Sequence, residues 1–149
     1  MNENDRKQVA ACGTFHHVTT ADGTSGIEES GLDPACDNSQ VIRGGRKDQA
    51  VYLCPAASIE KVSEILGDRE KDQEYLFVYE ISASALAKKN CGADVGWLVN
   101  IASPDKHTVE LSLEHGSIAC YEAIARSELR GPKKIRNPSH IGTSGGDEL

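Results

Sequence analysis

Short runs of apolar residues, separated by polar stretches, predict a sheet of several short strands. Residues 75–81 read Tyr-Leu-Phe-Val-Tyr-Glu-Ile, and they are the strongest strand prediction because aromatic and β-branched residues predominate. Residues 13–19 and 51–54 are shorter runs of the same character. A further strand is predicted over residues 96–101.

A strand is also predicted over residues 108–113, because Val109, Leu111 and Leu113 alternate with polar residues. Successive side chains of a strand point to opposite faces, so these three side chains would share one face. Glu110 would then point to the other face. The pattern therefore predicts a strand that carries a carboxylate.

Two helices are predicted from residue spacing and from signals at their ends. Apolar residues recur at helical spacing over residues 59–66, and Gly67 follows them. The segment 21–30 contains two glycines and is a weaker helix former. Thr20 can accept a backbone N–H at its start, and Gly31 suits the left-handed position that follows a helix.

Together these segments predict an α+β fold of about six short strands and two or three short helices. Their order lacks the regular strand–helix alternation of a doubly wound sheet, and no glycine-rich phosphate motif is present. The 149 residues suffice for one domain. We expect a flexible N-terminus over residues 1–12, a single domain over 13–130 and a basic, partly disordered tail over 131–149.

Composition narrows the function classes. The net charge of -7 argues against broad, non-specific binding to nucleic acid. No apolar run approaches the roughly 18 residues of a membrane-spanning helix, so no membrane partner is expected. The five cysteines show no C-x-x-C spacing, and the histidines show no zinc motif. We therefore expect no metal site and reduced thiols, and we expect the chain to be cytoplasmic when it is made.

Three chemistry-bearing residues occur in order on separate predicted strands, namely His17, Tyr52 and Glu110. Neighbouring residues of a strand face opposite sides, so either His16 or His17 can enter a cleft, but not both. The spacing His17-Val18-Thr19 favours His17. Taken singly, the three residues could equally be a strand histidine, a core aromatic and a solvated glutamate. Their order along the chain favours a shared site.

These motifs resemble those of the ADP-ribosyltransferase superfamily, especially small bacterial toxin-type members with a His-Tyr-Glu set. The resemblance covers most of residues 13–125 and implies a split β-sheet with short helices around a cleft for NAD, which is the substrate. The matching segments are His17-Val18-Thr19, Ser30-Gly31-Leu32-Asp33-Pro34, Ala50-Val51-Tyr52-Leu53, and Glu110 followed by residues 116–124.

The resemblance implies a role for each residue. Glu110 would stabilise the positive charge that develops on the ribose as nicotinamide leaves. Tyr52 would stack on the nicotinamide ring. His17 would hydrogen-bond the ribose on the adenosine side, and backbone groups near Val18 and Thr19 would hold the carboxamide.

Other residues bear on the same chemistry. Glu114 and Glu122 are rivals to Glu110 as the catalytic carboxylate. Many arginine-modifying members carry Glu or Gln two residues before the catalytic glutamate, where this chain has Thr108, so the acceptor stays open. Basic residues that could hold the pyrophosphate lie in the long polar loop: Arg43, Arg46 and Lys47.

The function that the resemblance implies is transfer of ADP-ribose from NAD to a protein or nucleic-acid acceptor, with release of nicotinamide. An NAD glycohydrolase would use the same residues with water as the acceptor. An RNA 2′-phosphotransferase-like enzyme and a non-catalytic binding module of the same fold are further alternatives. A toxin or effector domain would be delivered into a target cell and would have a cognate immunity protein.

Overall fold

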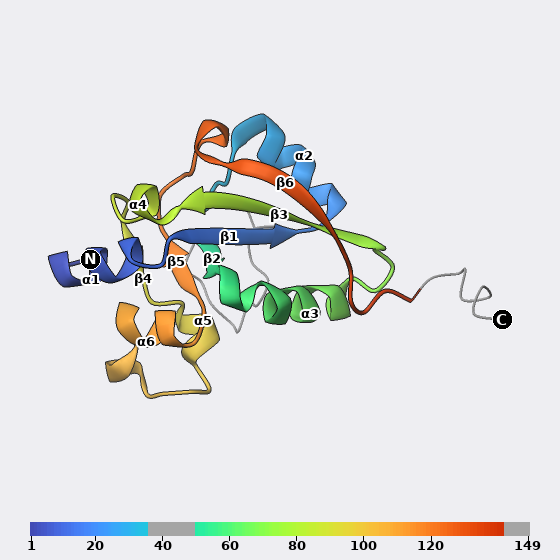
Figure 1. Ribbon diagram of the computed structural model, residues 1–149. Helices are drawn as coiled ribbons and strands as arrows, with labels where there is room; N and C mark the ends of the chain where they lie inside the picture. The colour runs from blue at the N-terminus through green and yellow to red at the C-terminus, as the bar shows by residue number, and fades with distance from the viewer. Residues whose placement is uncertain (36–49, 142–149) are drawn as a thin grey trace.

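The fold is α+β, and a computed structural model describes it over residues 1–35 and 50–141 (Figure 1). Within these residues one antiparallel sheet has the strand order β4-β5-β2-β1-β3-β6. The strands are β1 (Thr14–Thr19), β2 (Val51–Pro55), β3 (Tyr75–Ser82), β4 (Cys91–Gly92), β5 (Ile118–Cys120) and β6 (Arg130–Arg136). The helices are α1 (Glu3–Ala10), α2 (Ala21–Ser30), α3 (Ile59–Arg69), α4 (Ala83–Leu86), α5 (Val95–Leu98) and α6 (Val109–Glu114).

Strand β1 is paired very differently on its two sides. Against β3 it forms six consecutive antiparallel pairs, from Thr14–Ser82 to Thr19–Phe77. Against β2 the ladder comprises Phe15–Pro55 and His16–Cys54. The sheet is therefore split between β1 and β2 beyond His16, at the end of β1 that leads into α2.

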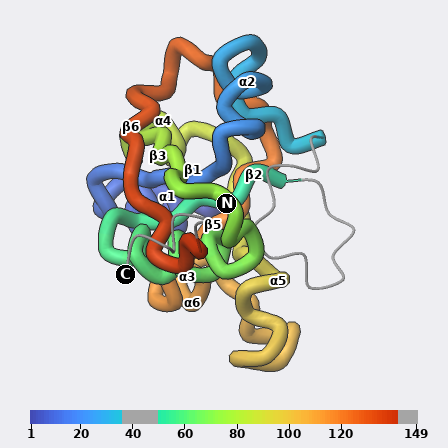
Figure 2. The backbone as a smooth tube through the Cα atoms, turned by 90° about the vertical axis from the view of Figure 1, so that its right-hand side faces the viewer, coloured from blue at the N-terminus to red at the C-terminus, as the bar shows by residue number. Residues whose placement is uncertain are grey.

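The two faces of the sheet are covered by different helices, with α2 and α3 on opposite sides in both views (Figures 1 and 2). Phe15 packs into the larger core cluster with Val9 of α1, Ile27 of α2 and Leu86 of α4. Val18 packs into a second cluster on the other face, where α3 lies. The alternation along β1 therefore directs His17 and Thr19 toward α2, and His16 and Val18 toward α3.

Helix α2 is attached to the sheet by hydrogen bonds to the exposed carboxylate of Glu28. The Tyr79 hydroxyl on β3 donates to Glu28 at 2.6 Å, and Arg126 donates to the same carboxylate at 3.1 Å. These contacts lower the pKa of Glu28, the hydrogen bond from Tyr79 contributing most. The helix ends at Gly31, whose φ of 76° is the left-handed conformation that favours glycine.

Several sequence predictions are confirmed. The segments 13–19, 51–54 and 75–81 are β1, β2 and β3, while 21–30 and 59–66 belong to α2 and α3.

Two strand predictions are wrong. Residues 108–113 form α6 instead of a strand, because Thr108 caps a helix there by accepting the Leu111 N–H at 3.1 Å. Val109 and Ser112 are the buried pair, three residues apart, as a helix requires. Residues 96–101 were likewise predicted as a strand, but α5 begins at Val95 behind an Asp94 cap.

The expectations for the two ends also need correction. Residues 1–12 were expected to be flexible, but they contain α1, whose Asn2 and Asp5 form a reciprocal capping box. Residues 131–149 were expected to be a tail, but Arg130–Arg136 pair with β3 as the edge strand β6. Backbone pairing with β3 supplies the order that the polar side chains of this segment do not reveal.

Candidate functional site

His17 bridges the split in the sheet. Its Nδ1 lies 3.1 Å from the carbonyl oxygen of Tyr52, just beyond the last β1–β2 ladder pair. A carbonyl accepts hydrogen bonds, so Nδ1 carries the proton and Nε2 is the acceptor of the neutral ring. Burial lowers the pKa of His17, and the bond to the Tyr52 carbonyl partly offsets this shift. A neutral ring with a fixed tautomer results.

A cavity of about 210 Å³ lies between the His17 side of β1 and helix α2. Thr20 caps α2 and Gly31 ends it, so the helix passes over the last residues of β1. The lining therefore combines residues from two of the sequence motifs, the one at His17 and the one that follows α2. The residues that line the cavity include His17, Thr19, Gly23, Ser30, Leu32 and Asp33.

Tyr52 borders the opposite side of the split. It is buried with Ala119 and Tyr121, and its side chain does not share the cavity of His17. It lines a pocket of about 20 Å³ together with Asp94 and Trp97. This volume holds about one water molecule and not an aromatic ring. The His17 ring thus contacts the Tyr52 backbone, whereas the side chains of His17 and Tyr52 line two different pockets.

Asp94 is the buried carboxylate beside Tyr52, and it was not singled out from the sequence. One carboxylate oxygen accepts the Trp97 N–H at 3.1 Å, and the other accepts the Ser117 hydroxyl at 2.6 Å. Ser112 supports this group by accepting the Asp94 N–H at 3.0 Å and donating to the Ser117 carbonyl at 2.6 Å. A signal existed, because an Asp that precedes a short apolar segment is a common helix cap.

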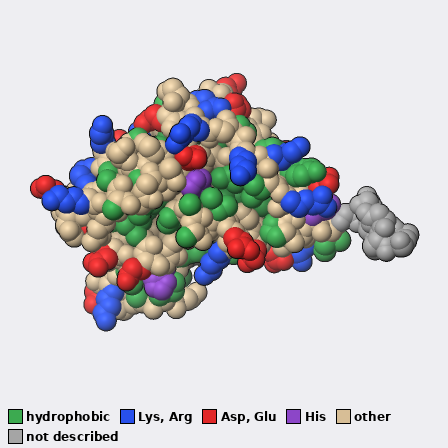
Figure 3. Space-filling model, in the orientation of Figure 1, with side chains coloured by type: hydrophobic (Ala, Val, Ile, Leu, Met, Phe, Trp, Pro, Cys, Tyr) green, Lys and Arg blue, Asp and Glu red, His purple; other side chains and the backbone are tan. Residues whose placement is uncertain are grey.

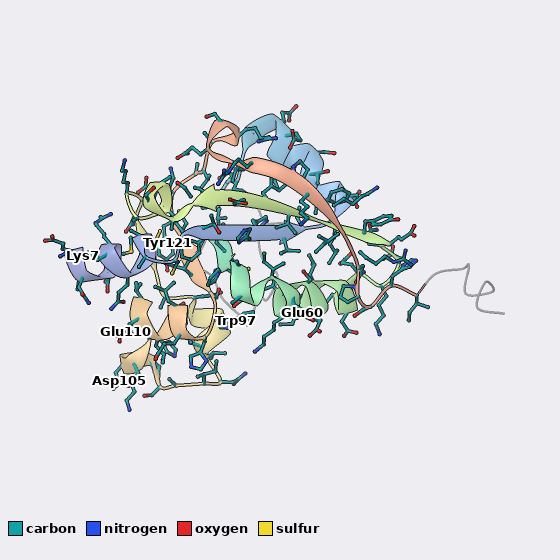
Figure 4. All side chains as sticks on the ribbon, viewed as in Figure 1. Lys7, Glu60, Trp97, Asp105, Glu110 and Tyr121 are labelled. Atoms are coloured by element: carbon teal, nitrogen blue, oxygen red, sulfur yellow. The ribbon has the colours of Figure 1, made fainter. Side chains whose placement is uncertain are left out.

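Glu110 lies apart from both residues. It is exposed on α6, where it lines a separate surface hollow with Glu114 and His115. Figures 1 and 2 place α6 and α2 at opposite ends of the molecule, and Figure 4 labels Glu110 on α6. The structure therefore does not gather His17, Tyr52 and Glu110 into one site.

The other predicted residues have separate places. Val18 is buried on the α3 face, whereas Thr19 lines the His17 cavity. The third carboxylate candidate, Glu122, accepts the Asn90 N–H and holds the start of β4. Arg43 and Arg46, predicted to hold the pyrophosphate, lie outside the described residues.

His16 faces the α3 side of β1 next to a charged pair. Its Nε2 lies 3.8 Å from Glu80, which in turn forms an ion pair of 2.6 Å with Arg130. These residues line a cavity of about 240 Å³ together with Lys133. Burial lowers the pKa of His16, and the Cys54 backbone and Glu80 partly offset this shift. Figure 3 shows basic and acidic side chains interspersed over the face in view, without one continuous basic patch.

A scan against protein-family models and a search of curated proteins both found no match to this chain. Among residues 1–35 and 50–141, no three His, Cys, Asp or Glu side chains gather closely enough to hold a metal ion. The helices of this described part are all too short or too polar to cross a membrane.

Proposed function

We propose that the chain binds NAD across the split between β1 and β2 and breaks the bond between its ribose and nicotinamide, as an ADP-ribosyltransferase does. The observation that carries the proposal is the His17–Tyr52 hydrogen bond, because it joins two of the resemblance motifs at one place. A further motif, Ser30-Gly31-Leu32-Asp33-Pro34 at the end of α2, contributes residues to the same cavity as His17.

The fit of NAD to the described residues is partial but chemically consistent. A volume of about 210 Å³ is below the ~300–1,000 Å³ of most ligand pockets, so it suits one nucleoside half of the dinucleotide. Nε2 of His17 is an acceptor and can take a hydrogen bond from a ribose hydroxyl. The nicotinamide half would enter beside Tyr52, where the present pocket must widen by displacement of Trp97.

In this proposal Asp94 takes the role that the resemblance gives to Glu110. The bond between ribose C1′ and the nicotinamide nitrogen breaks, and its electron pair leaves with nicotinamide. Positive charge then develops on the ribose, where a carboxylate stabilises it. The acceptor, a nucleophile or water, adds to C1′ and loses a proton. The Trp97 N–H and the Ser117 hydroxyl hold the Asp94 carboxylate in place, where Asp94 lines the pocket beside Tyr52.

The test measures nicotinamide release and transfer of label from NAD, with the purified chain alone and with a cell lysate. Asp94→Asn should lower nicotinamide release by about 100-fold, the usual cost of losing such an electrostatic group. The matched variant Glu110→Gln should stay within about twofold of wild type, since the Glu110 side chain is exposed and lines a separate surface hollow. Loss of release in Glu110→Gln instead would return the catalytic role to Glu110.

Trp97 offers a second readout because it is the sole tryptophan of the chain. NAD that enters beside Tyr52 should change the Trp97 emission, and release without transfer to the lysate would identify a glycohydrolase. Absence of release, label transfer and any Trp97 response would contradict the proposal.

A non-catalytic NAD-binding module is the second candidate. It is favoured by the full use of Asp94 as a helix cap and by the position of Glu110 on α6. In that case NAD should change the Trp97 emission while no nicotinamide is released.

A further inference from the structure

Two cysteines lie directly opposite each other at the edge of the sheet. Cys91 on β4 is the register partner of Cys120 on β5. The next pair along, Asn90 and Tyr121, is joined by a hydrogen bond of 2.9 Å from the Tyr121 N–H to the Asn90 carbonyl. Hydrogen-bonded and non-hydrogen-bonded pairs alternate in an antiparallel ladder. Cys91 and Cys120 therefore occupy a non-hydrogen-bonded pair, the type in which side chains come closest.

This position meets the geometric requirement for a disulfide. Cα atoms of a non-hydrogen-bonded pair are about 4.5 Å apart, and disulfides span Cα separations of roughly 4.4–6.8 Å. Both side chains belong to the same buried cluster, so they point to the same face of the sheet. Both cysteines are free thiols in this structure.

The two thiols already contact each other. The hydrogen bond with Cys91 lowers the pKa of Cys120, and burial opposes this shift. The Glu122 backbone and Lys89 lower the pKa further, while the Glu122 carboxylate raises it. The same hydrogen bond, together with burial, raises the pKa of the Cys91 thiol. Of the two thiols, Cys120 is the one whose pKa these contacts lower.

Cys54 provides the contrast within the chain. It is a buried thiol on β2 that packs with Val18 and Val62 on the α3 face. Burial alone raises its pKa to about 12. Burial therefore raises the pKa of Cys54, whereas the contacts of Cys120 shift its pKa in the opposite direction.

We propose that Cys91 and Cys120 are a redox pair that closes to an intramolecular disulfide in the presence of a peroxide or a small disulfide. With hydrogen peroxide, the Cys120 thiolate attacks one oxygen, the O–O bond breaks and a sulfenic acid forms as hydroxide leaves. The Cys91 sulfur then attacks the Cys120 sulfur, the S–O bond breaks and water leaves. Two thiols lose two electrons and two protons, and the peroxide becomes two waters. Glutathione disulfide performs the same oxidation by exchange and leaves two glutathione thiols.

Access to the buried pair comes through the edge of the sheet. Strand β4 is two residues long and pairs with β5 at one edge of the described sheet. Short edge elements open at low free-energy cost compared with global unfolding. Opening of β4 exposes both sulfur atoms without disrupting the central strands.

The pair lies on the same two segments that hold Asp94. Asp94 follows Cys91 by three residues, and its partner Ser117 precedes Cys120 by three residues. A disulfide would therefore fix the two segments that carry the Asp94–Ser117 hydrogen bond. The inference itself does not depend on NAD binding.

The test maps the cysteines of the full chain after equilibration in glutathione buffers of stepped oxidation ratio. Cleavage with trypsin after Lys89, Lys106 and Arg126 leaves Cys91 in peptide 90–106 and Cys120 in peptide 107–126. We expect these two peptides to be joined, with a mass lower by two hydrogens, and to separate again on reduction. One arm uses the native chain, and a second arm refolds the chain from urea in the same buffers so that burial does not limit access.

Cys54→Ser is the matched control and should retain the 90–106 to 107–126 linkage. Cys91→Ser and Cys120→Ser should each lose it, and far-ultraviolet circular dichroism shows whether each variant folds. A linkage between the two peptides in the refolded arm supports the pairing, even where the native chain forms the disulfide more slowly. Free Cys91 and Cys120 in the refolded arm, or a dominant linkage to any other cysteine, would overturn the proposal.

Discussion

His17 is fixed by the protein before any ligand arrives. Its ring is buried, its Nδ1–H donates to the Tyr52 carbonyl, and its neighbouring strands hold it on the α2 face. A ribose hydroxyl would therefore meet a preorganised acceptor at Nε2. The same bond satisfies the Tyr52 carbonyl, which has no β1 ladder partner at this position among the described residues.

Acidification should destabilise the fold through His17. Its pKa in the folded state is lowered by burial below the ordinary 6.5, so the unfolded chain binds the proton more readily. Stability is then complete above pH 6.5 and falls as the pH drops below it, by up to about 1.4 kcal/mol per pH unit for one such group. Urea unfolding at stepped pH between 7.5 and 5 (about the range of histidine titration) measures this slope.

His17→Gln keeps a donor for the Tyr52 carbonyl but removes the titration. Its slope of unfolding free energy against pH should be smaller than that of wild type over the same interval. An identical slope in the two proteins would show that His17 does not resist protonation in the folded state. His16 carries a shift of the same sign and accounts for part of the remaining slope.

Residue-level prediction from sequence succeeded where strand alternation applied. The rule that neighbours face opposite sides separates His16 from His17 correctly, because β1 is a regular strand. It failed for Glu110, since the alternation of three apolar residues over 108–113 is also compatible with a short helix. Asp94 was missed because its local signal is that of a helix cap, while its contact with Ser117 joins residues 23 positions apart along the chain.

At the scale of elements, α2 depends on how it ends. A Cβ at Gly31 would meet the Ile124 carbonyl oxygen and lie 2.8 Å from the Arg126 nitrogen, and φ is 76° there. Gly31→Ala should therefore lower the free energy of unfolding by about 2 kcal/mol or more.

Gly26→Ala is the matched change within the same helix, where a Cβ has open space. It should raise the free energy of unfolding by about 0.5–1 kcal/mol. Equal effects of the two changes in urea unfolding would contradict this account of α2.

Helix α3 ends against a residue that follows β6. The buried Asn137 amide donates to the carbonyl oxygens of Gly67, Glu70 and Gln73, and its own oxygen accepts the Ser139 N–H. These bonds satisfy carbonyls that a helix end leaves open.

Asn137→Asp should lower the free energy of unfolding by about 3 kcal/mol, because it removes the donors and brings a carboxylate near three carbonyl oxygens. Thermal and urea unfolding measure the loss. Asn100→Asp, at a residue that is exposed, is a matched control and should change stability by less than about 0.5 kcal/mol. A similar loss in both variants would contradict the capping role.

Element prediction worked for segments with strong local signals. Strands β1, β2 and β3 and helices α2 and α3 follow from apolar spacing and end residues. The short elements did not follow, because β4 and β5 have two and three residues and exist through pairing with each other and with β2. The sequence of strand β6 is that of a basic tail, and the strand forms because its backbone pairs with that of β3.

At the scale of the whole molecule, the sheet has two chemically different sides. The α2 side holds the His17 cavity, and the α3 side holds His16 with the Glu80–Arg130 ion pair. The split between β1 and β2 joins the two sides at one end. The proposed function places NAD at this split, with the adenosine half on the α2 side.

The most direct test of this placement is a titration with NAD followed by ¹⁵N magnetic resonance of the histidine rings. The free protein should show His17 as the neutral tautomer with the proton on Nδ1. NAD should shift the His17 Nε2 signal, and it should leave His140, which lies against the Lys71 carbonyl and lines neither pocket, unchanged. A His17 signal that stays fixed at saturating NAD, or a response confined to other histidines, would contradict binding at the β1–β2 split.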